Sequence, residues 1–197
     1  MTQKQKASYR GKPMEHKTRE YPQFAACGLN CGLCPRYYTE GPSRCPGCAG
    51  EGFSDVHPTC GILSCCQRKN IEYCFLCDEF PCEKYDRWGD ADSFITHRNY
   101  LSDMEKAKRI GMDNYKAELN EKIAILERLL SDYNDSRRKG YFCLAINLLE
   151  LQDIKSVMAQ LDRKDFSGAA VKEKAIAAVK LFDEVALQKG IILKLRK

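Results

Sequence analysis

The stretch AACGLNCGLCPRYY, residues 25–38, decides how the rest of the chain is interpreted. It places Cys27, Cys31 and Cys34 in the spacing C-x-x-x-C-x-x-C. A short turn can aim thiols at this spacing toward one metal ion. The stretch therefore raises a choice between a metal that performs chemistry and a metal that holds the chain together.

The cysteines are concentrated in one part of the chain. Eleven of the twelve lie between Cys27 and Cys82, and Cys143 lies apart. No apolar run approaches the ~20 residues that a membrane helix needs, and the N-terminus lacks the apolar core of a secretory signal. We therefore expect a cytoplasmic protein without a membrane segment. Thiols stay reduced in that compartment, so the cluster is interpreted as a metal site and not as a disulfide framework.

Three C-x-x-C pairs stand out in the cluster, namely Cys31/Cys34, Cys45/Cys48 and Cys74/Cys77. Each such turn supplies half of a tetrahedral zinc site. Neighbouring residues rarely bind one ion, so one of Cys65 and Cys66 is expected to be spare, and we take Cys65 as the ligand. The predicted metal ligands are Cys27, Cys31, Cys34, Cys45, Cys48, Cys60, Cys65, Cys74, Cys77 and Cys82.

The grouping of these thiols stays open at this point. The simplest arrangement is sequential, with two zinc ions. One ion would take Cys31, Cys34, Cys45 and Cys48, and the other Cys60, Cys65, Cys74 and Cys77. Cys27 and Cys82 are then left without a site, so an interleaved arrangement, a third ion or a bridged cluster is an alternative. His57 is either a replacement ligand or, as we favour, a solvated loop histidine, and Cys143 is expected to be a small buried hydrophobe.

Composition divides the chain into three regions. Residues 1–22 form a polar, basic lead-in that we expect to be a flexible tail. Residues 23–89 hold five of the seven prolines and show weak apolar periodicity, which predicts a small, loop-rich cysteine module stabilised by metal. Residues 90–197 show helical periodicity. The predicted fold class is therefore this cysteine module joined to an all-α bundle of about four helices.

Apolar spacing and capping residues give the bounds of the four expected helices. The first begins after Asp92 or Ser93 as the N-cap and ends at Gly111, and the second covers 113–130. A third covers 140–162, and a fourth covers 168–188, with Ser167 as its cap and Gly190 as its end. The apolar stripes on these helices are expected to form a shared core.

A family resemblance rests on several motifs taken in order. They are CGLNCGLCPRYY, RCPGC, CGILSC and IEYCFLCDEFPCEKY, followed by HRNYLSDMEKAKRIGMDNYKAEL. Together they resemble an uncharacterised bacterial and archaeal cysteine-rich family, a domain of unknown function for which zinc binding is presumed. The likeness covers about residues 24–130. It implies that the same ten cysteines are metal ligands, and it implies no reaction.

Formal charge bears on the choice of partner. Residues 1–26 carry +4, residues 27–82 carry −2 and residues 83–197 carry +3, which sum to the +5 of the chain. Duplex binding needs a basic face, and thiolates would make the module more acidic still. We therefore expect a structural-zinc adaptor that binds an unidentified protein partner. A nucleic-acid-binding zinc protein is an alternative that the acidic module disfavours, and no small-molecule substrate is inferred.

The cysteines leave two further alternative functions open. One is an iron–sulfur electron-transfer or sensing protein. The C-x-x-x-C-x-x-C spacing also matches the cluster loop of radical S-adenosylmethionine enzymes, but the helical remainder is too short for their α/β barrel. The other alternative is thiol redox chemistry at Cys65–Cys66 or at an unligated Cys27 or Cys82. No metalloprotease or deaminase motif is present in the sequence, so an enzyme is less expected than a binding protein.

Overall fold

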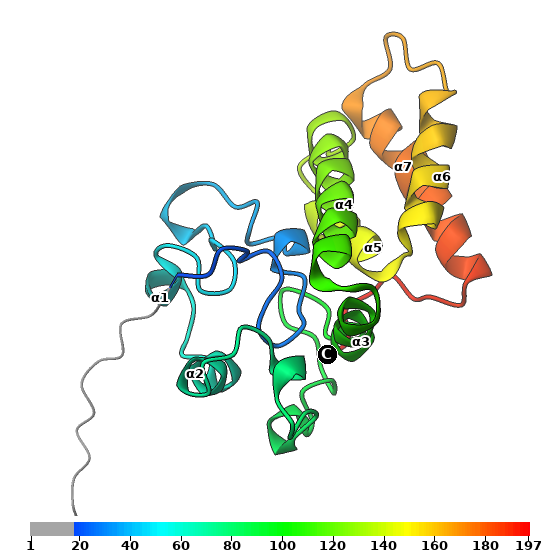
Figure 1. Cartoon of the computed structure of the whole chain (residues 1–197). Coiled ribbons are helices and arrows are strands. Elements are labelled where there is room, and N and C mark those ends of the chain that lie inside the picture. The colour runs from blue at the N-terminus through cyan, green and yellow to red at the C-terminus, as the bar shows by residue number, and fades with distance from the viewer. Residues whose placement is uncertain (1–17) are drawn as a thin grey trace, which may run out of the picture.

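The computed structural model describes residues 18–197, and within that range it contains helices and loops but no strand (Figure 1). The α-helices are α1 (Phe53–Val56), α2 (Gly61–Arg68), α3 (Tyr100–Ile110), α4 (Met112–Asp132), α5 (Lys139–Leu148), α6 (Leu151–Asp162) and α7 (Val171–Gln188). Four short 3-10 turns accompany them: η1 (Cys31–Leu33), η2 (Gly41–Ser43), η3 (Cys74–Leu76) and η4 (Glu83–Tyr85). The predicted loop-rich cysteine segment and the predicted all-α remainder are confirmed, whereas the metal in that segment stays a prediction.

Five helices follow residue 90, one more than expected, because the predicted third helix is broken. α5 ends at Leu148, and α6 begins at Leu151. Leu149 and Glu150 between them have extended backbone, with ψ of 149° and 148°. The buried Lys122 donates a hydrogen bond of 2.8 Å to the Leu149 carbonyl, which satisfies a group that the break leaves free. Apolar residues continue across the break, so periodicity alone could not reveal it.

Two predicted helix starts are also wrong. α3 begins at Tyr100 and not after Asp92 or Ser93, because the Asp92 carboxylate accepts the Arg196 N–H at 2.8 Å and is committed to a tertiary contact. α7 begins at Val171 and not after Ser167; the N–H of its N-cap residue Ala170 donates to the Glu173 carboxylate at 3.2 Å. The predicted glycine ends are confirmed, since α3 stops before Gly111 and Gly190 follows the end of α7 at a φ of 66°.

The predicted flexible tail lies mostly at residues 1–17, outside the described part of the chain. Its last residues are described, and they make contacts. The Arg19 guanidinium donates to the Phe24 carbonyl at 2.8 Å, and the Tyr21 hydroxyl donates to Asn120 Oδ1 of α4 at 2.7 Å. No helix of the described chain is both long and apolar enough to cross a membrane.

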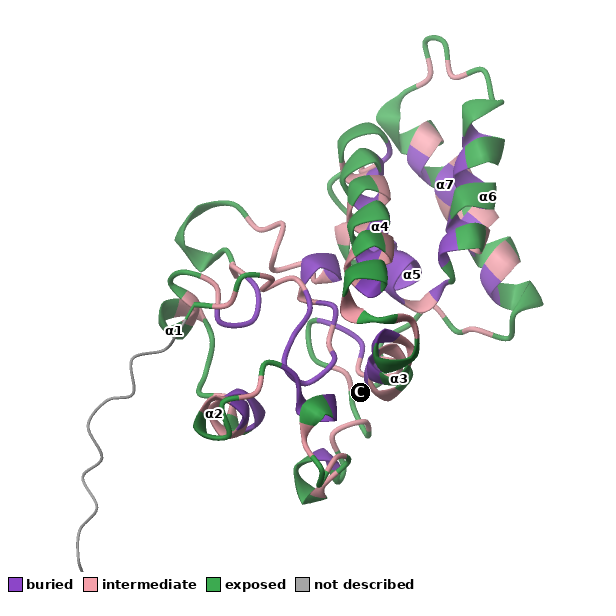
Figure 2. Cartoon of the chain, in the orientation of Figure 1, coloured by how far each residue is buried: buried purple, intermediate pink, exposed green. Residues whose placement is uncertain are grey.

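Buried residues of the cysteine segment and of the helices form one core cluster. η1 packs against α4 and α5, and η3 packs against α3. Phe24 is fully buried, and its ring lies 5.5 Å from Tyr73 and 4.6 Å from Tyr115 of α4. In Figure 2, buried colour runs along α5 and along the loop that approaches it. The cysteine loops are therefore positioned by direct packing on the helices.

Two glycines of the opening stretch allow this close approach. Gly28 has a φ of 89°, and a Cβ on it would lie 2.5 Å from the Tyr100 carbonyl oxygen of α3. A Cβ on Gly32 would lie 2.6 Å from the Ile123 side chain of α4. A positive φ favours glycine, and neither position has space for a side chain. The glycines thus let the chain between the first thiols lie directly on two helices.

A buried polar network joins the same loop to the helices. The Asn30 amide donates to Asp103 at 2.8 Å and to Asn147 Oδ1 at 3.2 Å, while the Tyr115 hydroxyl donates to Asn30 Oδ1 at 2.9 Å. Asn99 donates to the same Asp103 and Asn147 oxygens. Such a network fixes one relative placement of the elements because each member is costly to leave unpaired.

This network predicts a pH dependence of stability. Burial raises the pKa of Asp103 to about 7, although Lys122 and the Asn30 hydrogen bond favour the carboxylate. In the unfolded chain an aspartate pKa is about 3.9. The folded state therefore binds more protons between these values, and this contribution to the free energy of unfolding falls as pH rises from about 4 to about 7.

The test replaces the carboxyl with a group that does not titrate. We expect Asp103→Asn to remove part of the loss of stability between about pH 5 and about pH 8, measured by urea unfolding. The control Asp113→Asn, at an exposed position of α4, should keep the wild-type slope. Equal slopes in all three proteins would contradict the assignment.

Candidate metal centre

Two of the C-x-x-C pairs adopt the same backbone turn. The Cys34 N–H donates to the Cys31 carbonyl at 3.1 Å, and the Cys77 N–H donates to the Cys74 carbonyl at 2.9 Å. The second cysteine of each pair is extended, with φ and ψ of −84° and 135° at Cys34 and of −87° and 135° at Cys77. The chain therefore builds one local thiol-bearing geometry twice.

The likeness continues on both sides of the two turns. A hydrogen bond closes each turn before the pair, from Leu33 N–H to the Asn30 carbonyl and from Leu76 N–H to the Tyr73 carbonyl. A further turn follows each pair, closed by the N–H of the aromatic residue three positions after the second cysteine. The matching sequence pattern, C-x-L-C-x-x-aromatic, specifies this repeat.

The first thiol group surrounds η1. Burial raises the pKa of Cys31 well above its ordinary value, and the charges of neighbouring thiols raise it further. These neighbours are Cys48, Cys27, Cys34 and Cys45. Burial likewise raises the pKa of Cys48, and Cys60 acts in the same direction. We call the six residues the first thiol group: Cys27, Cys31, Cys34, Cys45, Cys48 and Cys60. Burial favours the protonated form of Cys27, Cys31, Cys34 and Cys48, because it raises the pKa of each of these thiols.

Arg19 brings a positive charge to this group. It lowers the pKa of Cys48 against the larger effect of burial. Its guanidinium lies 4.7 Å from the centre of the Tyr73 ring and 3.5 Å from the Glu72 carboxylate. Sequence reasoning placed Arg19 in the tail and missed it, since nothing in the cysteine spacing points to a residue before Cys27.

The second thiol group lies around η3 and the end of α2. It comprises Cys65, Cys66, Cys74, Cys77 and Cys82, which together line a pocket of about 420 Å³. Cys66 is the residue that sequence reasoning set aside, yet its sulfur lies 3.3 Å from that of Cys74. The Lys69 ammonium lies 3.2 Å from the Cys77 sulfur and 2.9 Å from the Glu79 carboxylate.

Cys74 differs from Cys31 and Cys48 of the first group in the direction of its pKa shift. A hydrogen bond between the Cys66 and Cys74 sulfurs lowers the pKa of Cys74 and raises that of Cys66. The nearby Tyr85 hydroxyl, Lys69 and Lys84 also lower the pKa of Cys74. Cys74 is thus more readily ionised than Cys66, and the thiolate is the form of cysteine that binds metal.

The two groups differ from the sequential grouping. Cys60 raises the pKa of Cys27 and of Cys48, and Cys82 lines the pocket of the second group. The two groups are adjacent, since Cys74 also raises the pKa of Cys27. Cys27, which the sequential grouping left without a site, lies with the first. Residues 18–197 contain no set of three or more His, Cys, Asp or Glu side chains already arranged to hold a metal ion. The ten ligands and their metal stay a prediction.

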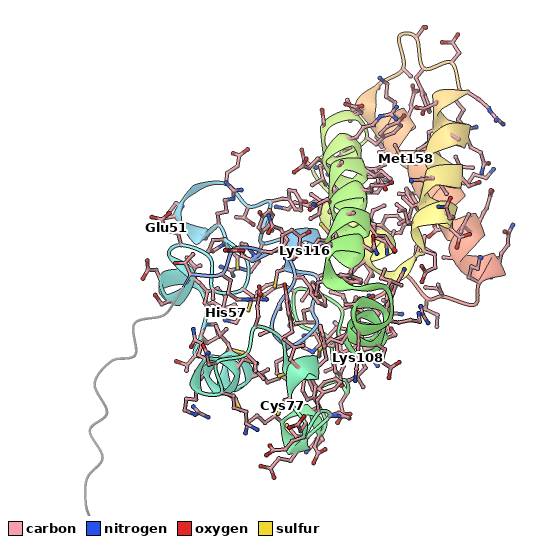
Figure 3. All side chains as sticks on the ribbon, in the orientation of Figure 1. Glu51, His57, Cys77, Lys108, Lys116 and Met158 are labelled. Atoms are coloured by element: carbon pink, nitrogen blue, oxygen red, sulfur yellow. The ribbon has the colours of Figure 1, made fainter. Side chains whose placement is uncertain are left out.

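The remaining candidate residues lie outside these groups. His57 is exposed; its ring stacks on Phe53 at 4.5 Å, and its Nδ1 lies 2.8 Å from the Pro58 carbonyl oxygen. Figure 3 shows His57 and Cys77 in separate parts of the cysteine segment. Cys143 is buried on α5, and burial raises the pKa of its thiol.

The segment from Cys27 to Cys82 has a counterpart among known families. Residues 23–87 match the family described as protein of unknown function, DUF3795. The sequence resemblance noted above extends to about residue 130, whereas the family match ends at residue 87, before α3. A search of curated proteins found no match to the chain, and a search of solved structures found none. The DUF3795 segment therefore contains both thiol groups and the two matching turns at Cys31–Cys34 and Cys74–Cys77.

Proposed function

We propose that the DUF3795 segment is a zinc-binding module that fixes the shape of its own loops, and that the whole protein acts as an adaptor for a protein partner. The observation that carries the zinc proposal is the repeated turn at Cys31–Cys34 and Cys74–Cys77. A turn that presents two sulfurs in the same way at two places is the unit from which four-thiolate zinc sites are built.

The residues present fit this ion. The first thiol group offers six soft sulfur ligands, of which Cys27 and Cys48 are buried, next to Arg19, whose positive charge offsets part of the charge of a four-thiolate site. Cys31, Cys34, Cys45 and Cys48 would hold the first ion, with Cys27 and Cys60 as alternates. Zinc would supply cross-links between loops that have little apolar core of their own.

The adaptor role draws on the helical part of the protein. α7 carries large apolar side chains that face solvent, with Ile176 49% exposed and Leu187 82% exposed. A rigid helix that presents such residues between charged ones is a common kind of protein-binding surface. The zinc module would fix the cysteine loops that pack against the helices. Catalysis is not part of the proposal.

A second candidate applies to the second thiol group alone. Five thiols line one pocket of about 420 Å³, together with the cations Arg68, Lys69 and Lys84 and the carboxylates Glu79 and Glu83. Iron–sulfur clusters are held by cysteine thiolates, are larger than a single ion and are anionic, so nearby cations stabilise them. This pocket is the place in the described chain where an iron–sulfur cluster would fit, and the protein would then be an electron-transfer or sensing protein.

Elemental analysis of the protein, purified under anaerobic conditions, tests both candidates. We expect two zinc atoms per chain, no more than traces of iron and no absorption in the visible range. A brown protein with iron and acid-labile sulfide would contradict zinc at the second group and support the cluster there. A protein that holds neither metal after purification, and that binds none when zinc is added to the reduced chain, would refute the metal proposal.

A further inference from the structure

A pocket of about 360 Å³ lies apart from the two thiol groups. Four segments that are distant in sequence line it: the η1 region with Leu33 and Pro35, residues 94–96, one face of α5 from Gly140 to Asn147, and the last residues, 193–197. We call it the tail pocket. Its volume lies in the range of small-molecule sites, and its lining is mostly apolar, as in such sites.

The walls of the tail pocket are held by hydrogen bonds. The Arg98 guanidinium donates to the carbonyls of Ile192 at 2.7 Å and of Lys194 at 3.1 Å. The Asp92 carboxylate, whose side chain is fully buried, accepts the Arg196 N–H, and the Asp92 N–H donates to the Arg196 carbonyl at 3.1 Å. The last residues are thus fixed beside α5, and the pocket is preformed.

One buried polar group in the lining has an unused donor. Asn147 is 3% exposed, and its Oδ1 accepts hydrogen bonds from Asn30 at 3.2 Å and from Asn99 at 3.1 Å. These two donors determine which end of the amide is the oxygen. Its Nδ2 donates to no atom of residues 18–197, and it is not one of the fully buried side-chain atoms that lack a partner. Since Asn147 lines the tail pocket, an oxygen of a bound molecule would satisfy it.

Lysines bring positive charge to the pocket. Lys194 and Lys197 line it, and no aspartate or glutamate does, although Asp92 and Asp183 are hydrogen-bonded to the lining residues Thr96 and Tyr141. Arg36 lies beside the pocket, with its guanidinium 5.0 Å from the centre of the Phe94 ring. An apolar cavity with lysines and no acid in its lining favours a molecule that is apolar in its body and negative at one group.

We propose that the tail pocket binds a small carboxylic acid with an aliphatic body. The carboxylate offers both the negative charge that the lysines favour and an acceptor for the Asn147 amide. The aliphatic body contacts Leu33, Leu144 and Leu193. The proposal uses none of the ten predicted metal ligands, although Leu33 and Pro35 in the lining flank the predicted ligand Cys34.

A pocket-filling variant tests the location. Gly140 lines the pocket, and a Cβ added to it meets no atom within 4 Å, so Gly140→Phe places a ring at the mouth without strain. The control, Ala159→Phe, adds the same ring at an exposed position of α6. Calorimetric titration of the full-length protein with decanoate should show binding to the wild type and to Ala159→Phe. Gly140→Phe should bind at least about tenfold more weakly.

A charge-reversal variant tests the chemistry. Lys194→Glu with Lys197→Glu should weaken decanoate binding by at least about tenfold, whereas the uncharged decanol should bind the variant and the wild type equally. The proposal is overturned if millimolar decanoate gives no binding heat, or if Gly140→Phe binds it as well as the wild type. Equal effects of the charge reversal on decanoate and decanol would overturn the preference for an acid.

Discussion

Cys45→Ser and Cys77→Ser are each expected to lose metal and to unfold the DUF3795 segment. Each variant removes one thiolate from one of the two thiol groups. Structural zinc contributes about 10–16 kcal/mol in zinc-finger peptides, as much as or more than the about 5–15 kcal/mol that holds a typical domain folded. We expect zinc content to fall by one ion per chain, and the thermal midpoint to fall by roughly 10–20 °C for about 5 kcal/mol lost.

A cysteine outside both groups provides the matched control. Cys143 is 1% exposed on α5, so Cys143→Ser makes the same change outside both groups, at a site more buried than Cys45 or Cys77. It should keep its full metal content and lose about 1–3 kcal/mol, because a hydroxyl is buried in place of a thiol. Full metal content with wild-type melting in both Cys45→Ser and Cys77→Ser would refute the structural role of the metal.

Phe24→Ala is expected to produce the second large effect. Phe24 is fully buried between Tyr73 of the cysteine segment and Tyr115 of α4. Removing its ring leaves a cavity where the two parts of the core meet, and such changes cost about 3–5 kcal/mol. The measurement is the free energy of unfolding in urea, with metal content determined on the same samples.

The companion variant is Phe94→Ala. Phe94 is 63% exposed, and its ring contacts the Arg36 guanidinium. Loss of such a contact at the surface should cost less than about 1 kcal/mol. If the two variants were equally stable, the core between the cysteine segment and α4 would contribute less than the packing of Phe24 indicates.

The sequence predicts the fold well where a local rule applies. Glycines end α3 and α7 because only a change of backbone direction was needed there. Prediction from the sequence fails where a tertiary contact overrides the local rule. Asp92 has the side chain of an N-cap but binds Arg196, which is 104 residues away. The bend at Leu149 is invisible in the apolar pattern because both α5 and α6 bury their leucines.

The same division holds for the candidate site. Spacing identifies the C-x-x-C turns because each turn is local. Spacing cannot tell which turn faces which, so the grouping of the thiols into metal sites stays a prediction. Arg19 and the contact of Cys66 with Cys74 were missed for the same reason, since both depend on how distant loops fold back. The glycines of CGLNCGLC indicate that the chain packs closely there, but they do not identify the helices against which it packs.

The network of Asn30 also sets an order of events during synthesis. Asn30 bonds to Asn147, which lies 117 residues later in the chain. At about 5–20 residues per second, α5 emerges from the ribosome roughly 6–25 s after the first thiols. During that interval α3 and α4 emerge, but the cysteine loops still lack α5, against which η1 also packs. Their thiols meet the surrounding solution, with its metals and oxidants, before the surface that later buries them is complete.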